Sequence, residues 1–212
     1  MSGTIAGLYA ITPEEPRTEI LVDKVRQALS GGAAVVQYRN KTGNAALREE
    51  QGRALAAVCR AAGAPFIVND DLALALALDA DGVHLGAEDG DLVAARRRLG
   101  QGKLLGASCY DRIELARAAV AAGVDYLAFG SVFASGTKPA AVRAPLALFV
   151  EARRSISLPL VAIGGITLQN ASQVFAAGAD AAAVIGALFE ASDISACASG
   201  FSQLYKQQRI HQ

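Results

Sequence analysis

Cationic and amide side chains follow one of the chain's apolar runs, at the place where a strand would end. The segment reads Gln37, Tyr38, Arg39, Asn40 and Lys41. Because alternate residues of a strand face the same side, Gln37, Arg39 and Lys41 are predicted to point together. An arginine can bind two phosphate oxygens at once, and a lysine adds a point charge. We therefore predict an anion-binding segment here, with a solvated loop as the alternative.

Aspartates follow the next two apolar runs. Asp70 comes directly after a run that ends at Asn69, and Asp89 comes shortly after His84, which ends the other run. Magnesium prefers oxygen ligands and usually takes one or two carboxylates together with substrate phosphates and water. Asp70 and Asp89 are therefore predicted to bind Mg2+. Helix N-capping is the alternative for both, and Asp71 is the better candidate for a cap.

A loop rich in hydroxyl groups and glycine is a second candidate anion site. It contains Ser135, Gly136, Thr137 and Lys138. Backbone N–H groups and hydroxyls can hold a phosphate while Lys138 neutralises its charge. The spacing differs from the GxxxxGK of nucleotide-binding P-loops. We predict phosphate binding of another kind, with a surface loop as the alternative.

The sequence gives little support to other catalytic chemistry. Neither a Ser-His-Asp nor a Cys-His arrangement is evident, and no lysine lies inside an apolar run as a Schiff-base candidate. His84 could act as a general base, but a packing role is the favoured interpretation. Two anion sites and a metal site without a nucleophile predict phosphate or pyrophosphate chemistry that depends on positioning and electrostatic stabilisation.

Short apolar runs alternate with longer amphipathic ones along the whole chain, and these elements must position the polar residues. The expected strands are Gly7–Ile11, Ala34–Tyr38, Phe66–Asn69, Gly82–His84, Leu104–Ser108, Tyr126–Gly130, Leu160–Ile163 and Ala182–Ile185. The expected helices are Thr18–Ser30, Ala45–Ala62, Asp91–Leu99, Arg112–Ala122, Ala144–Ser155, Leu168–Ala177 and Asp193–Arg209.

Such alternation implies parallel pairing, because each parallel step needs a crossover connection. The sequence therefore predicts an α/β fold, a single-domain (β/α)8 TIM barrel over residues 1–212. An open, doubly wound sheet is the competitor, but it usually carries GxGxxG after its first strand. This chain has Thr12, Pro13, Glu14 and Glu15 there. In a barrel the chemistry lies at the carboxyl ends of the strands, where the polar residues fall.

Glycines after the last two expected strands extend the candidate anion site. Gly164 and Gly165 follow the seventh strand, and Gly186 follows the eighth directly after Ile185. The loops at these positions of a barrel frequently bind phosphate. Glycine lets the backbone approach an anion closely. A tight strand-to-helix turn is the alternative, and it explains one glycine better than two.

Composition argues against several classes of partner and location. The 212 residues carry a formal net charge of zero, so neither nucleic acid nor a membrane surface is expected as a partner. Cys59, Cys109 and Cys197 are scattered and odd in number, which predicts a reducing cytoplasm rather than disulfides or a zinc site. We expect no signal peptide and no membrane helix. Both a monomer and a homo-oligomer are compatible with the composition.

Seven motifs, spread from near residue 7 to residue 188, together resemble the thiamine phosphate synthase family. They are GLYAITP, VVQYRNK, FIVNDD, ADGVHLGAED, DYLAFGSVFASGTKP, LVAIGGIT and AGADAAAVIGAL. The resemblance implies a Mg2+-dependent transferase with two small-molecule substrates. It would join 4-amino-2-methyl-5-hydroxymethylpyrimidine pyrophosphate to a thiazole phosphate, carboxylated or not, by a dissociative substitution that gives thiamine phosphate and pyrophosphate.

The resemblance also implies roles for individual residues. Asp70 and Asp89 would hold Mg2+. The aminopyrimidine pyrophosphate would be bound by Gln37, Tyr38, Arg39, Asn40, Lys41, Asn69, Ser108 and Lys138. The thiazole phosphate would be bound by Ser135, Gly136, Thr137, Gly165, Ile185 and Gly186. The residues implied to assist departure of pyrophosphate are Arg39, Lys41, Ser108 and Lys138.

The sequence departs from the family pattern in three places. Ser135-Gly136 replaces the usual Thr-Pro, Gly186 replaces a frequent Ser, and Cys109-Tyr110 replaces a small polar residue and His.

Three rival interpretations remain open. A related thiazole tautomerase would need a positioned His and could dispense with the metal ligands. A non-catalytic ligand-binding barrel and a sugar-phosphate isomerase are the other rivals. The paired aspartates and the run of cations favour the synthase.

Overall fold

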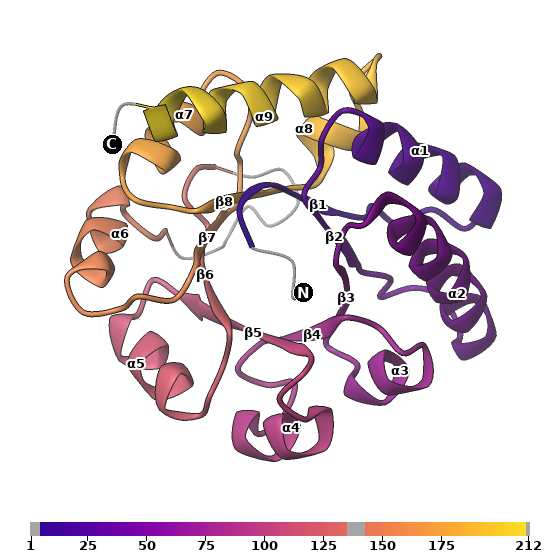
Figure 1. Ribbon diagram of the computed structural model, residues 1–212, viewed down its shortest axis with the longest axis horizontal. Coiled ribbons are helices and arrows are strands. Elements are labelled where there is room, and N and C mark those ends of the chain that lie inside the picture. Colours follow the sequence, from indigo (N-terminus) through magenta and orange to yellow (C-terminus); the bar gives the residue numbers. More distant parts are fainter. Residues whose placement is uncertain (1–4, 135–142, 211–212) are drawn as a thin grey trace.

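The structure, a computed structural model, describes residues 5–134 and 143–210. Within them eight parallel strands close into a barrel in chain order, which confirms the predicted fold. Figure 1 looks down this ring of strands, with the helices arranged around it. The strands are β1 (Gly7–Ile11), β2 (Val35–Tyr38), β3 (Phe66–Asn69), β4 (Gly82–Leu85), β5 (Leu104–Tyr110), β6 (Tyr126–Gly130), β7 (Leu160–Ile163) and β8 (Ala181–Val184).

The helices form the outer layer (Figure 1). They are α1 (Thr18–Ser30), α2 (Ala45–Ala62), α3 (Leu72–Ala77), α4 (Leu92–Leu99), α5 (Ile113–Ala121), α6 (Leu146–Arg153), α7 (Ala171–Ala176), α8 (Gly186–Phe189) and α9 (Ile194–Ile210). The last of these packs against α1, α7 and β1 and so covers the seam where the barrel closes. Among the described residues, no helix has the length and apolarity that crossing a bilayer would require.

Two hydrophobic cores follow from the alternation of side chains along each strand. One set of strand residues points outward against the helices, including Val36, Val68 and Leu127. The alternate set fills the barrel interior, including Val35, Ile67 and Val161. Both sets are essentially fully buried. The barrel interior is therefore a packed core that supports the residues at its mouth, as this fold requires.

Aspartates before β4, β6 and β8 join neighbouring strands at the amino-terminal end of the barrel. The carboxylates of Asp81, Asp125 and Asp180 accept hydrogen bonds from the backbone N–H groups of Phe66, Leu105 and Leu160, at 2.8, 2.7 and 2.8 Å. Asp125 and Asp180 also pair with Arg96 and Arg153. These ion pairs lie at the end of the barrel that a TIM barrel uses for stability rather than chemistry.

Two short helices were not expected from the sequence. The segment LALALA forms α3, although its alternation has a period of two and carries no helical signal. Asp71 caps this helix, as predicted, by accepting a 2.9 Å hydrogen bond from the Leu74 N–H. The single turn of α8 follows β8 directly. Other helices are shorter than expected; for example, α6 begins at Leu146 because Pro145 precedes it as the N-cap.

Candidate functional site

A cavity of about 1140 Å³ opens at the carboxyl ends of the strands. The predicted site residues that line it are Gln37, Arg39, Lys41, Asn69, Asp70, Asp89, Ser108, Gly165, Ile185 and Gly186. These residues come from β2, β3, β5, the first residue of α8 and the loops after β2, β3, β4, β7 and β8. Residues far apart in the sequence are thus gathered at one mouth. Ser135, Gly136, Thr137 and Lys138 lie outside the described residues.

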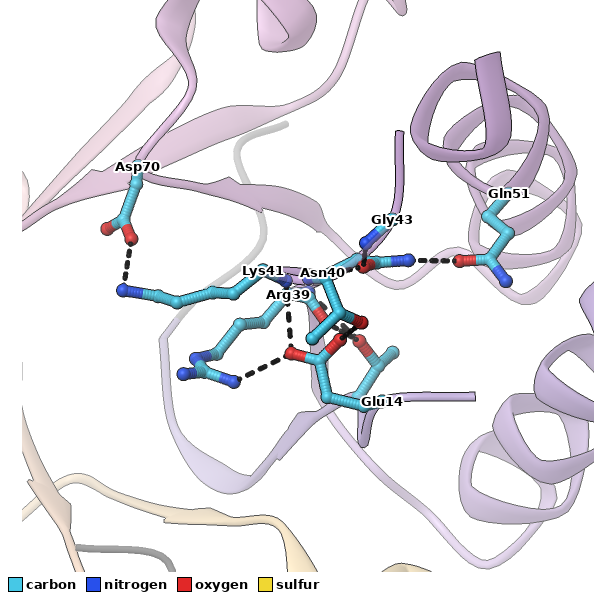
Figure 2. Close-up of polar contacts among 9 residues, drawn as sticks. Glu14, Arg39, Asn40, Lys41, Gly43, Gln51 and Asp70 are labelled. Carbon is cyan, nitrogen blue, oxygen red and sulfur yellow. Dashed lines mark hydrogen bonds and ion pairs between the residues drawn. The ribbon is translucent and has the colours of Figure 1, made fainter. Parts of the chain in front are cut away.

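The segment after β2 presents its side chains to two different sides. Arg39 and Lys41 reach toward the cavity, whereas Asn40 turns toward Gln51 of α2 (Figure 2). The Gln51 Oε1 accepts hydrogen bonds of 2.9 Å from the Asn40 amide and from the Tyr38 hydroxyl. Tyr38 and Asn40 therefore face helix α2 and are not part of the cavity lining, which leaves Gln37, Arg39 and Lys41 as the ligand-facing residues.

Glu14, in the loop after β1, holds the cationic segment in place (Figure 2). Its carboxylate accepts hydrogen bonds from the Arg39 guanidinium at 3.2 Å, the Lys41 backbone N–H at 3.0 Å and the Thr42 hydroxyl at 2.8 Å. Burial alone would raise the pKa of Glu14, but these hydrogen bonds and the charge of Arg39 outweigh it and lower the pKa. Glu14 is therefore an ionised anchor for the segment.

Thr12 adds a second anchor from the same loop. Its fully buried hydroxyl accepts a 2.9 Å hydrogen bond from the Arg39 N–H and donates to the Arg39 carbonyl at 3.2 Å. Both backbone groups of Arg39 are thereby fixed to the end of β1. A segment held this way can present its cations to a ligand with little loss of conformational entropy on binding.

The two aspartates predicted as metal ligands lie side by side at the cavity wall. Asp70 receives the Lys41 ammonium at 3.1 Å, and Asp89 accepts a 2.9 Å hydrogen bond from the Gly86 N–H. Partial burial and then the neighbouring Asp70 raise the pKa of Asp89. Asp70 thus disfavours the charge of Asp89, which is the situation that a divalent cation relieves. Within the described part of the chain, no cluster of three or more potential metal-ligating side chains was found.

A chain of hydrogen bonds crosses the floor of the cavity. Gln37 contacts the Tyr9 hydroxyl at 2.9 Å, and the hydroxyls of Tyr9 and Tyr126 lie 2.8 Å apart. The His84 ring joins Tyr126 through Nδ1 at 3.1 Å and Ser108 through Nε2 at 2.9 Å. Burial lowers the pKa of His84 to about 4, so its imidazole is neutral at physiological pH. His84 is thus a buried residue at the cavity floor, with a hydrogen-bond partner at each ring nitrogen.

Paired glycines shape the opposite wall of the cavity, at the end of β7. Gly164 and Gly165 have φ angles of 101° and 63°, a region that favours glycine. A Cβ at Gly164 would lie 2.1 Å from the Ser131 Oγ, and one at Gly165 would lie 2.2 Å from the Ala134 carbonyl oxygen. The segment after β6 therefore requires glycine at both positions, and the two glycines place backbone at the cavity surface.

Sequence reasoning missed four residues that organise this site. Thr12 and Glu14 follow the first strand directly, so the rule that chemistry gathers at carboxyl ends could have drawn attention to them. Tyr9 and Tyr126 lie within strands and read as ordinary apolar core residues. Nothing in their local sequence indicates that their hydroxyls meet across the barrel, because that contact joins β1 to β6.

Comparisons with known proteins agree on one family. Residues 8–188 match the family model described as thiamine monophosphate synthase. A thiamine-phosphate synthase of Aromatoleum aromaticum is 59% identical over 95% of this chain and 97% of its own length. That of Methylobacillus flagellatus is 55% identical over 95% and 96%.

A solved structure supports the same relationship. The thiamine phosphate pyrophosphorylase of Pyrococcus furiosus superposes with a TM-score of 0.85 at 36% identity, over 96% of both chains. Sequence, family model and fold thus point to one group of proteins. The chain therefore belongs to the thiamine monophosphate synthase family.

Proposed function

We propose that the protein is a thiamine-phosphate synthase, a transferase that joins 4-amino-2-methyl-5-hydroxymethylpyrimidine pyrophosphate to a thiazole phosphate. The observation that carries this proposal is the meeting of Arg39 and Lys41 with the Asp70 and Asp89 carboxylates at one cavity wall. A departing pyrophosphate needs positive charge on its oxygens, and this wall supplies two cations beside a candidate metal site. Family membership supports the choice of substrates.

The proposed reaction is a dissociative substitution. The bond between the pyrimidine methylene carbon and the pyrophosphate oxygen breaks, and pyrophosphate leaves with the bonding electrons. The electron-rich aminopyrimidine stabilises the methylene cation, to which the thiazole nitrogen then gives its lone pair. Arg39, Lys41 and Lys138 would stabilise the charge growing on the leaving group. Such a reaction needs no protein nucleophile and no strong base.

Mg2+ is the proposed cofactor, held by Asp70 and Asp89. The donor set fits, because two carboxylates with substrate phosphate oxygens and water make up the usual environment of this ion. The raised pKa of Asp89, caused by partial burial and then by Asp70, also supports a cation between them. When bound, the ion would neutralise charge on the pyrophosphate and so favour its departure.

The thiazole phosphate is proposed to bind on the opposite wall. Gly165 and the backbone of Ile185 and Gly186 line the cavity there. In this fold the loops after β7 and β8 frequently bind phosphate. Ser135, Gly136 and Thr137 would complete the site. The pyrimidine would lie between the two walls, near Gln37, Asn69 and Ser108, which places the reacting carbon between both anions.

The thiazole tautomerase alternative is less well supported. That isomerisation would need a histidine with a nitrogen available to the substrate. Both ring nitrogens of His84 are already engaged, by Tyr126 and Ser108, and the side chain is buried. The remaining histidine, His211, lies outside the described residues. The synthase needs no such base.

We further propose that the whole chain, residues 1–212, acts as one catalytic domain in the cytoplasm. Cys59 and Cys109 are buried free thiols and Cys197 is also free, and free thiols are common among proteins of reducing compartments. Burial raises the pKa of Cys59 and of Cys109 to about 12, which keeps both thiols protonated and unreactive.

Product analysis tests the proposed function. Purified protein is incubated with both substrates and Mg2+, and thiamine phosphate and pyrophosphate are quantified separately. The proposal predicts that the two products form in equal amounts and that neither forms when either substrate is omitted. Absence of thiamine phosphate, together with isomerisation of the thiazole phosphate alone, would instead establish the tautomerase.

A further inference from the structure

Five polar side chains from five different strands form one continuous hydrogen-bonded chain beneath the cavity. In order they are Gln37, Tyr9, Tyr126, His84 and Ser108, joined at 2.9, 2.8, 3.1 and 2.9 Å. All but Ser108 are buried, and the hydroxyls of Tyr9 and Tyr126 have almost no contact with solvent. A chain of this kind is polarised from end to end, because each hydroxyl that accepts one hydrogen bond gives its own hydrogen to the next group.

The amide of Gln37 sets the direction of the chain. Its nitrogen faces the Tyr9 hydroxyl and can only donate, so the Tyr9 oxygen accepts. Tyr9 then donates to Tyr126, and Tyr126 donates to the Nδ1 of His84. A neutral imidazole carries one proton, so the proton of His84 lies on Nε2 and is directed to the Ser108 Oγ.

We infer that Gln37 positions Ser108 from the far end of this chain of hydrogen bonds: it fixes His84 in the Nε2–H tautomer and thereby makes Ser108 a hydrogen-bond donor toward the cavity. Ser108 accepts from His84, which leaves its own hydrogen to be given to an oxygen of the bound substrate. The consequence for substrate rests on the proposed function, since Ser108 would then donate to the leaving pyrophosphate. The tautomer itself is a property of the free protein.

The reverse direction defines the test. If residue 37 could only accept, Tyr9 would donate to it, Tyr126 would donate to Tyr9, and His84 would donate from Nδ1. Ser108 would then give its hydrogen to His84 and present only lone pairs to the cavity. Gln37→Glu makes this change with nearly the same shape, because an ionised carboxylate is an acceptor without a hydrogen to give.

Nitrogen-15 NMR of histidine-labelled protein reports the tautomer directly, because protonated and unprotonated ring nitrogens have well-separated shifts. The protein has two histidines, so the histidine signals that remain in the His211→Gln variant belong to His84. We expect the Nε2–H form in the unsubstituted protein and the Nδ1–H form in Gln37→Glu at mildly alkaline pH. The double variant Gln37→Glu with Tyr9→Phe should return to the Nε2–H form, because the hydrogen bonds that link residue 37 to Tyr126 are then lost.

Several results would overturn the inference. An Nδ1–H tautomer in the unsubstituted protein would contradict it even if Gln37→Glu failed to fold. A tautomer unchanged in Gln37→Glu, or switched equally in the double variant, would show that direction is not transmitted through Tyr9. Because the spectra need no turnover, a protein that shows the expected tautomers without making thiamine phosphate would refute the proposed function and leave the hydrogen-bonded chain intact.

Discussion

The Lys41 ammonium lies 3.1 Å from a carboxylate oxygen of Asp70, so a proposed pyrophosphate ligand is paired with a proposed metal ligand. The ammonium group of this lysine supplies a positive charge beside the two aspartates. Arrival of pyrophosphate and Mg2+ would separate them, with Lys41 moving to the phosphate oxygens. Lys41 should therefore compete with the metal when substrate is absent and cooperate with it when substrate is present.

Replacing Lys41 tests this competition. We expect Lys41→Met to strengthen binding of Mn2+, used as a probe for Mg2+, by about two- to fivefold in the absence of substrate, since exposed ion pairs contribute little. The same variant should bind pyrophosphate more weakly. Calorimetric titration measures both. Lys103→Met is the matched control, because Lys103 pairs with Asp79 at the other end of the barrel. Unchanged or weaker metal binding in Lys41→Met would count against competition.

Glu14 should control the affinity for the pyrimidine pyrophosphate without touching it. Removing its carboxylate in Glu14→Ala frees the Arg39 guanidinium and the Lys41 backbone, so KM should rise about tenfold, the equivalent of one charge-assisted hydrogen bond. Glu14→Gln keeps an acceptor oxygen and should have a smaller effect.

Steady-state kinetics with each substrate varied in turn measures this change. The KM for the thiazole phosphate should stay unchanged, because Glu14 anchors only the segment after β2. Glu49→Ala serves as the control, since Glu49 pairs with Arg53 on the exposed face of α2. Equal effects on both KM values would mean that Glu14 supports the fold in general rather than this segment.

The ion pair between Arg96 and Asp125 should matter for stability rather than catalysis. Arg96 is buried, and Asp125 also accepts from the Leu105 N–H. Asp125→Ala therefore leaves that backbone donor unpaired and removes the carboxylate that pairs with the Arg96 guanidinium, which keeps its hydrogen bonds to backbone carbonyls. Because Asp125 itself is partly exposed, we expect a loss of about 2 kcal/mol in the free energy of unfolding.

Urea unfolding measures this loss, and Glu49→Ala is the control because Glu49 is exposed and pairs with Arg53 on the surface of α2. Activity per folded molecule should be unchanged in Asp125→Ala, since the pair lies at the amino-terminal end of the barrel. A stability within experimental error of the control would show that the ion pair contributes little.

The sequence predicts the barrel well because its signals are local and repeated. Each strand is a short apolar run, and glycines such as Gly63, with a φ angle of 68°, end helices where the pattern indicates. The segment LALALA was missed because its helix depends on the Asp71 cap and on packing against β3, not on helical periodicity. Short helices that depend on tertiary contacts carry weak signals of their own.

The site residues show the same difference between local sequence signals and contacts between distant segments. Arg39, Lys41, Asp70 and Asp89 were predicted as site residues because charged residues shortly after buried strands stand out. Residues such as Glu14 and Tyr126 act through contacts between distant segments, and a single sequence does not contain those pairings. The family resemblance implied substrate contacts for Tyr38 and Asn40 as well, whereas alternation along the segment directs both side chains toward Gln51 of α2 and away from Gln37, Arg39 and Lys41.

The metal dependence of product formation tests the central claim most directly. Thiamine phosphate would be measured with Mg2+, with EDTA and with Mg2+ restored, for the unsubstituted protein, Asp89→Ala and the control Asp91→Ala, in which a helix cap is removed from α4. We predict synthesis that EDTA abolishes, that Mg2+ restores, and that falls at least about 100-fold in Asp89→Ala but little in the control. Full synthesis in EDTA, or equal activity of the two variants, would contradict a magnesium-assisted synthase built on Asp70 and Asp89.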